Sequence, residues 1–436
     1  GNNNTAVGYY SLAANTTGHS NIAIGYYSLY SNTTGIYNTS QGNDSLYYNL
    51  TGSYNTATGF ASLQKNLSDY NTAHGAYSLF SNTTGTANTA QGYQSLKDNT
   101  TGTSNTAQGM YSLNANTTGD ANTSIGYQSL QSNTTGSYNT ATGYQSLYTN
   151  SGSYNTAHGY RSLYSNTTGI NNTATGYESL NKNTTGSYNT AVGYYTLHNN
   201  SGSYNTATGY KSLQNNTEGS NNTAYGGYSL YSNTTGNTNA SLGGYALYQN
   251  TTGTNNTAQG YSSLQNNTTG DANTSIGYQS LYKNTTGIRN TATGYHALYA
   301  NSGSYNTATG YDSLYSNTTG TQNTAIGYGT LYTSTTASYN TAIGYEALKL
   351  NTSGDHNTAV GIKAMDKNTT GDGNTAQGAY TLRNNTEGDG NSAQGYNSLY
   401  SNTTGNANTA QGYSSLQSNT TGYSNTATGY QSLHSN

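Results

Sequence analysis

Large aliphatic residues recur along the chain every 17 residues or so, and the positions between them are mostly small or polar. The stretch from Asn172 to Tyr188, NTATGYESLNKNTTGSY, shows the pattern, and we number its positions slots 1 to 17. Slot 9 is Leu, as at Leu180 and Leu197, in every repeat except one with Met365, and slots 3 and 8 hold only Ala, Ser or Thr. Because invariant apolar positions face a core and variable polar positions face water, slot 9 is predicted to be buried and slots 4, 7 and 10 exposed.

The slot-5 glycine gives the register of 26 repeats, from Gly8 to Gly429. Four repeats are 16 residues long, and each deletion falls after slot 12, which indicates a surface turn. Seventeen Gly- and Thr-rich residues cannot hold two helices, so each repeat is expected to be a coil with two short extended stretches and two turns. The fold class is therefore predicted to be all-β, a single parallel β-solenoid (β-roll) of 26 coils. Residues 1–436 are read as one continuous domain and a segment of a longer chain.

Asparagine is the most constant polar residue of the repeat. Slot 1 is Asn in all 26 repeats, and slot 12 is Asn in all of them except the one with Ser334. Asparagines stacked at a fixed position can pass amide hydrogen bonds to the copies above and below. We therefore predict structural ladders that include Asn172 and Asn189 in slot 1 and Asn183 and Asn200 in slot 12. The glycines of slots 5 and 15 are predicted to stand at tight corners with positive φ.

Tyrosine is the second regular feature. Slot 6 is usually Tyr, as at Tyr177 and Tyr194, and five repeats that lack a ring there carry Tyr in slot 7 instead. We therefore expect one aromatic ring per coil at this corner. Stacked on neighbouring coils, these rings would form a ladder, each pair contributing roughly 0.5–1.5 kcal/mol beyond burial.

Composition restricts the function classes. Only 6% of the residues are charged, the net charge is −3, and Pro, Trp and Cys are absent, while Gly (55) and Tyr (49) are abundant. This bias is the opposite of a disordered chain. Without a basic cluster we expect no nucleic-acid partner, and without a long apolar run no membrane span in this segment. The lack of Cys excludes disulfides and thiolate metal sites.

Residues with reactive side chains are few. The seven histidines are expected to occupy exposed variable positions, and His74 and His158 are five coils apart, too far to share a metal. Acidic residues near turns, such as Asp355 and Asp372, are expected to be isolated. We therefore predict no enzyme, and no catalytic, cofactor-binding or metal-binding residues.

The Asn-x-Ser/Thr pattern at slot 12 is compatible with N-glycosylation. It offers acceptors such as Asn15, Asn32, Asn183 and Asn233. Five repeats keep the slot-12 asparagine but lose the acceptor pattern, and this favours the ladder interpretation over a glycosylated surface.

The motifs NTAIGY at Asn323 and Asn340 and NTAVGY at Asn4 and Asn189 resemble the head repeats of trimeric autotransporter adhesins. Similar arrays occur in phage tail fibres and large secreted bacterial proteins. The resemblance implies a left-handed parallel β-roll, an extracellular or cell-surface location, and side-by-side trimers with a host-surface or glycan ligand. The coils here are slightly longer than those of the family and contain more Tyr, and neither a stalk nor an anchor barrel is visible in the sequence.

Three function classes compete at this point. A structural fibre is favoured because both terminal repeats look like ordinary coils, and uncapped solenoid ends can associate head to tail. An adhesin head or tail-fibre module predicts trimers that bury the Tyr-rich slots 6, 7 and 10. An ice-binding protein predicts a flat Thr face, which slot 2 favours, although slot 4 is irregular.

Overall fold

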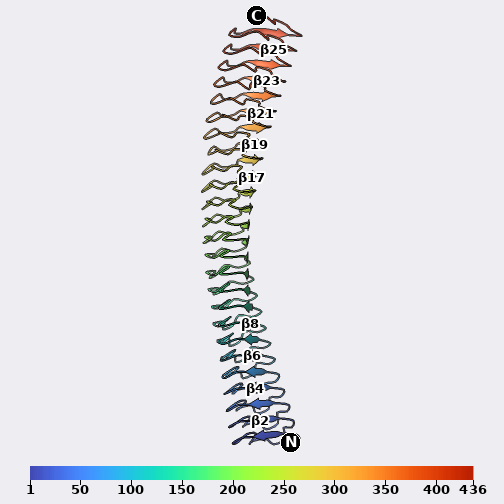
Figure 1. Cartoon of the computed structure of the whole chain (residues 1–436), viewed down its shortest axis with the longest axis vertical. Helices are drawn as coiled ribbons and strands as arrows, with labels where there is room; N and C mark the ends of the chain where they lie inside the picture. The colour runs from blue at the N-terminus through green and yellow to red at the C-terminus, as the bar shows by residue number, and fades with distance from the viewer. Residues whose placement is uncertain (436) are drawn as a thin grey trace. The chain divides into compact units, whose positions relative to one another are not determined.

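The computed structural model describes residues 1–435, and these form an all-β parallel solenoid with one short strand in each repeat (Figure 1). Their contacts divide the chain into two compact units, Gly1–Ser220 and Asn221–Asn436. The strands of the first unit are β1 Thr5–Val7, β2 Ile22–Ile24, β3 Thr39–Gln41, β4 Thr56–Thr58, β5 Thr72–His74, β6 Thr89–Gln91, β7 Thr106–Gln108, β8 Thr123–Ile125, β9 Thr140–Thr142, β10 Thr156–His158, β11 Thr173–Thr175, β12 Thr190–Val192 and β13 Thr206–Thr208.

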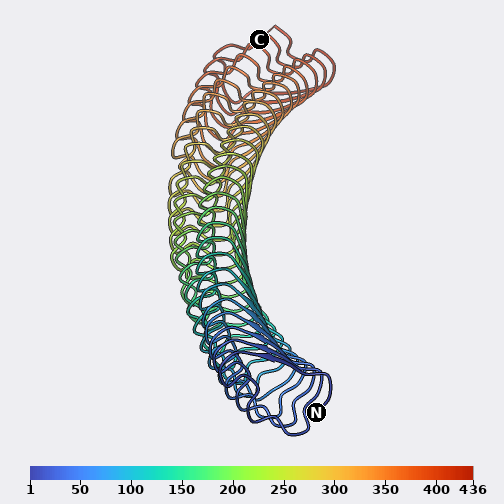
Figure 2. The ribbon, with the colours of Figure 1, turned by 60° about the horizontal axis from the view of Figure 1, so that its bottom comes forward.

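The second unit repeats the same arrangement. Its strands are β14 Thr223–Tyr225, β15 Ala240–Leu242, β16 Thr257–Gln259, β17 Thr274–Ile276, β18 Thr291–Thr293, β19 Thr307–Thr309, β20 Thr324–Ile326, β21 Thr341–Ile343, β22 Thr358–Val360, β23 Thr375–Gln377, β24 Ser392–Gln394, β25 Thr409–Gln411 and β26 Thr426–Thr428. Within each unit the colours in Figure 2 change gradually from coil to coil, so neighbours in sequence are neighbours in space.

Every strand covers slots 2 to 4, and within each unit the strands of adjacent coils pair in parallel and in register. Thr173 of β11 is opposite Thr190 of β12, and Ala174 is opposite Ala191. The 16-residue coils keep the same register, as the pairing of β9 with β10 shows. The deletion is therefore absorbed in the turn after slot 12, as its position in the sequence predicts.

Each coil contributes a small apolar core, made of the residues in slots 3, 8 and 9. Leu180 and Leu197 have no exposed surface, and the same holds for the small slot-3 and slot-8 residues Ala174 and Ser179. Alternation along β11 places Ala174 inside and Thr173 and Thr175 outside. Because each coil buries little more than one leucine and two small side chains, its stability depends on contact with the coils on either side.

The predicted second extended stretch is wrong. Slots 6 to 10 form turns, and the residues of slots 7, 9 and 17 have a left-handed backbone, with φ of 50° at Glu178, 49° at Leu180 and 58° at Tyr188. This conformation costs a non-glycine residue roughly 1–2 kcal/mol. The cost is offset because the backbone amide of each of these residues donates a hydrogen bond to an adjacent coil. The amide of Glu178 donates to Tyr160 O (2.9 Å), that of Leu180 to Thr196 O (3.0 Å) and that of Tyr188 to Ile170 O (3.0 Å).

The two repeated glycines have different roles. Slot-5 glycines have positive φ as predicted, for example 126° at Gly176. The slot-15 prediction is wrong, because glycines such as Gly186 do not have positive φ. Position 186 requires glycine for steric reasons, because a Cβ atom there would lie 2.3 Å from Gly202 O and 2.4 Å from Asn183 Oδ1.

Exposure differs from the prediction at slots 7 and 10. Most slot-7 side chains are only partly exposed, and Glu346 retains 8% of its surface. Slot 4 is exposed or partly exposed, but Asn181 and His198 in slot 10 each retain only 8% of their surface. They are covered because the left-handed turns bring slots 7 and 10 of adjacent coils together: Asn181 Nδ2 donates to Arg161 O (3.0 Å), a slot-7 carbonyl.

Candidate functional site

The slot-1 asparagines form a ladder in the interior. The backbone amide of Asn189 donates to Oδ1 of Asn172 (3.0 Å), and the side-chain Nδ2 of Asn189 donates to the same oxygen (3.1 Å). Asn172 repeats both bonds to Asn155 on the preceding coil. One side-chain oxygen per coil therefore satisfies two donors of the next coil.

The slot-12 asparagines form a second ladder on the opposite side of the turn. Nδ2 of Asn183 donates to Oδ1 of Asn166 (2.9 Å), and Nδ2 of Asn200 donates to Oδ1 of Asn183 (3.0 Å). Asn183 and Asn200 are fully buried. In the interior an unsatisfied amide would cost about 1–3 kcal/mol, so a continuous ladder is needed once the asparagines are buried.

The two ladders meet at the slot-15 glycine. The carbonyl oxygen of Gly186 accepts from Nδ2 of Asn172 and from Nδ2 of Asn183, both at 2.8 Å. All three residues belong to one coil, so these bonds close the turn while the ladder bonds join it to its neighbours. The convergence leaves no room for a side chain at slot 15.

The asparagines in glycosylation sequences are involved in this same network. Asn32, Asn183 and Asn233 have no exposed surface, and Nδ2 of each donates to the slot-15 carbonyl of its own turn. Asn15 is partly buried and makes the equivalent bond to Gly18 O (3.0 Å). Since Nδ2 is the atom that would carry a sugar, this geometry disfavours modification of the folded chain.

Stacked tyrosines follow the outside of the slot-6 corner. Tyr177 and Tyr194 lie 5.2 Å apart with an interplanar angle of 17°. In each unit six slot-6 rings stack without interruption: Tyr127, Tyr144, Tyr160, Tyr177, Tyr194 and Tyr210 in the first, and Tyr261, Tyr278, Tyr295, Tyr311, Tyr328 and Tyr345 in the second. All of these rings except Tyr160, which is less exposed, remain about 40–50% exposed.

The expectation of one ring per coil at this corner is too strict. Where slot 7 supplies the tyrosine, the ring still contacts the ladder, usually edge on, as between Tyr93 and Tyr111 (5.6 Å, 86°). Two coils have no ring in either slot: one carries Asn43 and Asp44, the other Ile362 and Lys363. The ladder is therefore interrupted at these coils, and the fold tolerates the interruption.

A charged cluster that was not predicted from the sequence occupies slots 7 and 10 of the second unit. Lys349 Nζ donates to Glu346 Oε1 (2.6 Å), and Lys363 Nζ lies 3.3 Å from Glu346 Oε2. Burial opposes ionisation of Glu346, but the bonds from both lysines outweigh it and lower its pKa. The bond to Glu346 raises the pKa of Lys349. The signal in the sequence was charge at slots 7 and 10 of adjacent repeats.

His198 in the first unit is buried, so its predicted exposed position is wrong. Its Nε2 lies 3.2 Å from Glu178 Oε2, and its ring centroid lies 4.9 Å from that of Tyr195. Burial, together with the negative charge of Glu178, raises the pKa of Tyr195 to about 12. The same left-handed turns that cover slot 10 produce this cluster.

Asp355 and Asp372 are not isolated, contrary to expectation, because slot 16 also stacks. The amide of Asp355 donates to Asp372 Oδ1 (2.7 Å), and that of Asp372 donates to Asp389 Oδ1 (2.8 Å). His74 and His158 are exposed in slot 4, on β5 and β10. Among residues 1–435 no three His, Cys, Asp or Glu side chains are grouped as metal ligands would be.

Comparison with known protein families and curated proteins identifies no relative. No protein-family model matches the sequence, and no curated protein does either. The structure itself establishes a parallel β-solenoid of tandem repeats with asparagine and tyrosine ladders. Over the described part of the chain there is no helix long and apolar enough to cross a membrane.

Proposed function

We propose that the chain is a structural, non-enzymatic element of an extracellular fibre, built by stacking β-solenoid coils. The observation that supports this proposal is that, inside each unit, a coil is bonded to both of its neighbours by a recurring set of contacts. In the coil that begins at Asn172, the amide of Thr173 donates forward to Asn189 O (2.8 Å), and that of Gly176 donates back to His158 O (2.8 Å). A stack of coils joined by such recurring hydrogen bonds is suited to serve as an elongated structural element.

Such contacts also suit assembly between chains. A coil that ends a stack presents unpaired strand groups, and an open strand edge templates pairing with another chain. Head-to-tail contact of that kind produces an open filament. The fibre would therefore grow with the same hydrogen bonds that hold each chain together.

Cryo-electron microscopy of the purified chain, recorded without imposed symmetry, tests the proposal. We expect filaments with an axial spacing of about 4.8 Å. A matched pair of variants tests the contact in a chain of residues 1–436: Thr426→Pro removes a strand amide for which no acceptor is found among the described residues, whereas Thr426→Val keeps it. In that chain, filaments should shorten with Thr426→Pro alone. Single chains at every concentration would refute head-to-tail assembly.

An adhesin head or tail-fibre module is the second candidate, supported by the exposed tyrosines. Tyr188 and Tyr204 in slot 17 stack at 5.0 Å and are 48% and 58% exposed. Aromatic rows of this kind are enriched at protein interfaces, and the resemblance to autotransporter head repeats implies a side-by-side trimer. Native mass spectrometry distinguishes the candidates, because an adhesin head would be a discrete trimer.

A further inference from the structure

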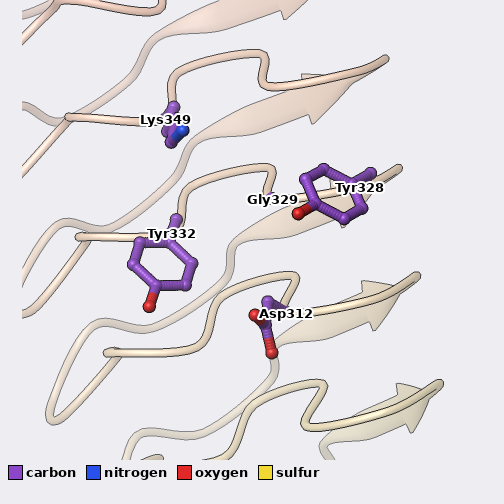
Figure 3. Close-up of a pocket in the computed structure, with 5 residues that line it drawn as sticks. All are labelled: Asp312, Tyr328, Gly329, Tyr332 and Lys349. Atoms are coloured by element: carbon purple, nitrogen blue, oxygen red, sulfur yellow. The ribbon is translucent and has the colours of Figure 1, made fainter.

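A small cavity opens on the second unit where Gly329 stands in slot 7. Every other repeat has a side chain at this slot. The missing side chain leaves a cavity of about 270 Å³ lined by Asp312, Tyr328, Gly329, Tyr332 and Lys349. Figure 3 shows the two tyrosines on either side of Gly329, with Asp312 on the preceding coil and Lys349 on the following one.

The walls of this cavity are held in place by the ladders. Tyr328 stacks on Tyr311 at 5.4 Å, and Tyr332 stacks on Tyr315 at 5.2 Å, with interplanar angles of 9° in both pairs. The slot-10 ladder ends at Tyr332, because Lys349 follows it on the next coil. The side of Tyr332 that faces the cavity therefore has no further ring of that ladder against it.

The polar groups of the cavity differ in their partners. Oδ1 of Asp312 is buried and accepts no hydrogen bond from the described residues, although His296 Nδ1 lies 3.4 Å away. Burial raises the pKa of Asp312, and His296 only partly offsets this effect. Lys349 is paired with Glu346. The cavity thus offers one acceptor that needs a donor, beside an ammonium group whose charge is already balanced.

We propose that this cavity binds a neutral sugar ring of hexopyranose size. A hydroxyl can donate to Asp312 Oδ1, another can accept from Lys349, and the C–H face of the ring can lie against Tyr332, where the slot-10 ladder ends. Tyr328 is stacked on both faces, by Tyr311 and Tyr345, and can offer only its edge. An anionic ligand would be repelled by the Asp312 carboxylate. A cationic ligand could pair with Asp312 but would lie beside the Lys349 ammonium, and it is the alternative that a cationic probe tests. The volume lies below the usual range for larger ligands, about 300–1,000 Å³, so one ring is the appropriate size.

The binding is expected to be weak, since few groups contact the ligand and one side is open to solvent. Saturation-transfer NMR on the full chain is suited to millimolar affinities. The probes are methyl α-glucopyranoside, methyl β-galactopyranoside, methyl α-mannopyranoside and N-acetylglucosamine, with argininamide as a cationic probe. At least one sugar should give a saturable signal, and argininamide should give none.

Substitutions then locate the signal. Gly329→Gln should abolish it by filling the cavity; Gln is accommodated in slot 7 at similar φ elsewhere, and a Cβ at Gly329 has only Glu346 Cγ nearby, at 3.8 Å. Asp312→Asn should weaken binding several-fold. The matched control Gln128→Gly, in the first unit, opens a notch next to Tyr127 without an adjacent carboxylate in slot 7, and should leave the original signal unchanged.

Three results would overturn the proposal: no sugar signal, a signal that persists in Gly329→Gln, or binding of argininamide in preference to sugars. Hydrogen exchange of the coils around Gly329 shows whether each variant keeps its fold. If Gly329→Gln disturbs the fold, Asp312→Asn decides: an unchanged sugar affinity then refutes the site.

Discussion

The slot-12 ladder is interrupted in one coil, and the interruption gives a quantitative test of the ladder. Ser334 replaces the asparagine there, and its Oγ has no hydrogen-bond partner. On the preceding coil Asn317 Oδ1 is also buried without a partner, and Asn351 Nδ2 on the following coil keeps only its bond to Gly354 O. The same coil carries the only slot-15 alanine, Ala337. We interpret the two exceptions as linked.

The physical reason for the link is steric. In an ordinary coil, a Cβ at slot 15 would lie 2.4 Å from the Oδ1 of its own slot-12 asparagine, as calculated for Gly186 and Asn183. The shorter serine at 334 removes this contact, one of the two that oppose a Cβ at slot 15, and so makes alanine easier to accommodate at 337. Ser334→Asn alone should gain little, since the new amide would collide with Ala337. Ala337→Gly alone should lose about 0.5–1 kcal/mol through unfolded-state entropy.

The double variant Ser334→Asn/Ala337→Gly should restore the ladder. It adds a bond to Asn317 Oδ1, one to the carbonyl of residue 337 and one from Asn351 Nδ2. At about 1 kcal/mol each, these bonds contribute roughly 3 kcal/mol, and after the loss of about 0.5–1 kcal/mol for Ala337→Gly the net gain is roughly 2–2.5 kcal/mol. Most of this gain should appear as coupling between the two sites.

Native-state hydrogen exchange of the full chain, read by mass spectrometry, is the appropriate assay, because a repeat array need not unfold in one step. Peptides covering residues 317–351 should exchange more slowly in the double variant, and peptides from the first unit should not change. If Ser334→Asn alone protects these peptides as well as the double variant does, the steric argument is refuted. If neither protects them, the ladder contributes no stability.

Three further predictions follow from the contacts described above. Leu180→Asp should unfold its own and the adjacent coils, seen as lost exchange protection there, whereas Leu180→Met should cost less than about 1.5 kcal/mol. Gly186→Ala should be more destabilising than Gly373→Ala in thermal unfolding, because a Cβ at Gly373 meets open space and only its φ of 65° opposes alanine. Glu346→Gln should lower stability at pH 7; because the folded-state pKa of Glu346 lies below its ordinary value of 4.5, the difference from wild type should vanish as the pH falls through that folded pKa.

Much of the coil could be predicted from the sequence. The constant leucine, the small slots 3 and 8 and the register came directly from the 17-residue pattern, because each has the same environment in every coil. The asparagine ladders could be predicted for the same reason. These features depend on which residue recurs, and the sequence states that directly.

The backbone between the corners could not be predicted. Left-handed φ in slots 7 and 9 falls on residues such as Gln279 and Leu180, which carry no local preference for that conformation. It is imposed by hydrogen bonds to adjacent coils, which a single repeat does not reveal. The burial of His198 and the cavity at Gly329 follow from this backbone, so they were missed with it.

The left-handed turns also explain why a coil is stable only in a stack. A single coil would contain three strained residues, with a total cost of roughly 3–6 kcal/mol, and would bury one leucine. The backbone amide of each strained residue donates a hydrogen bond to an adjacent coil. In the coil that begins at Asn172, two of these three bonds go to the preceding coil and one to the following coil. A coil therefore offsets its strain only when both neighbours are in place. Strain of this kind favours long arrays over short ones and makes addition of a further coil more favourable than formation of the first, which is the behaviour a fibre-forming chain requires.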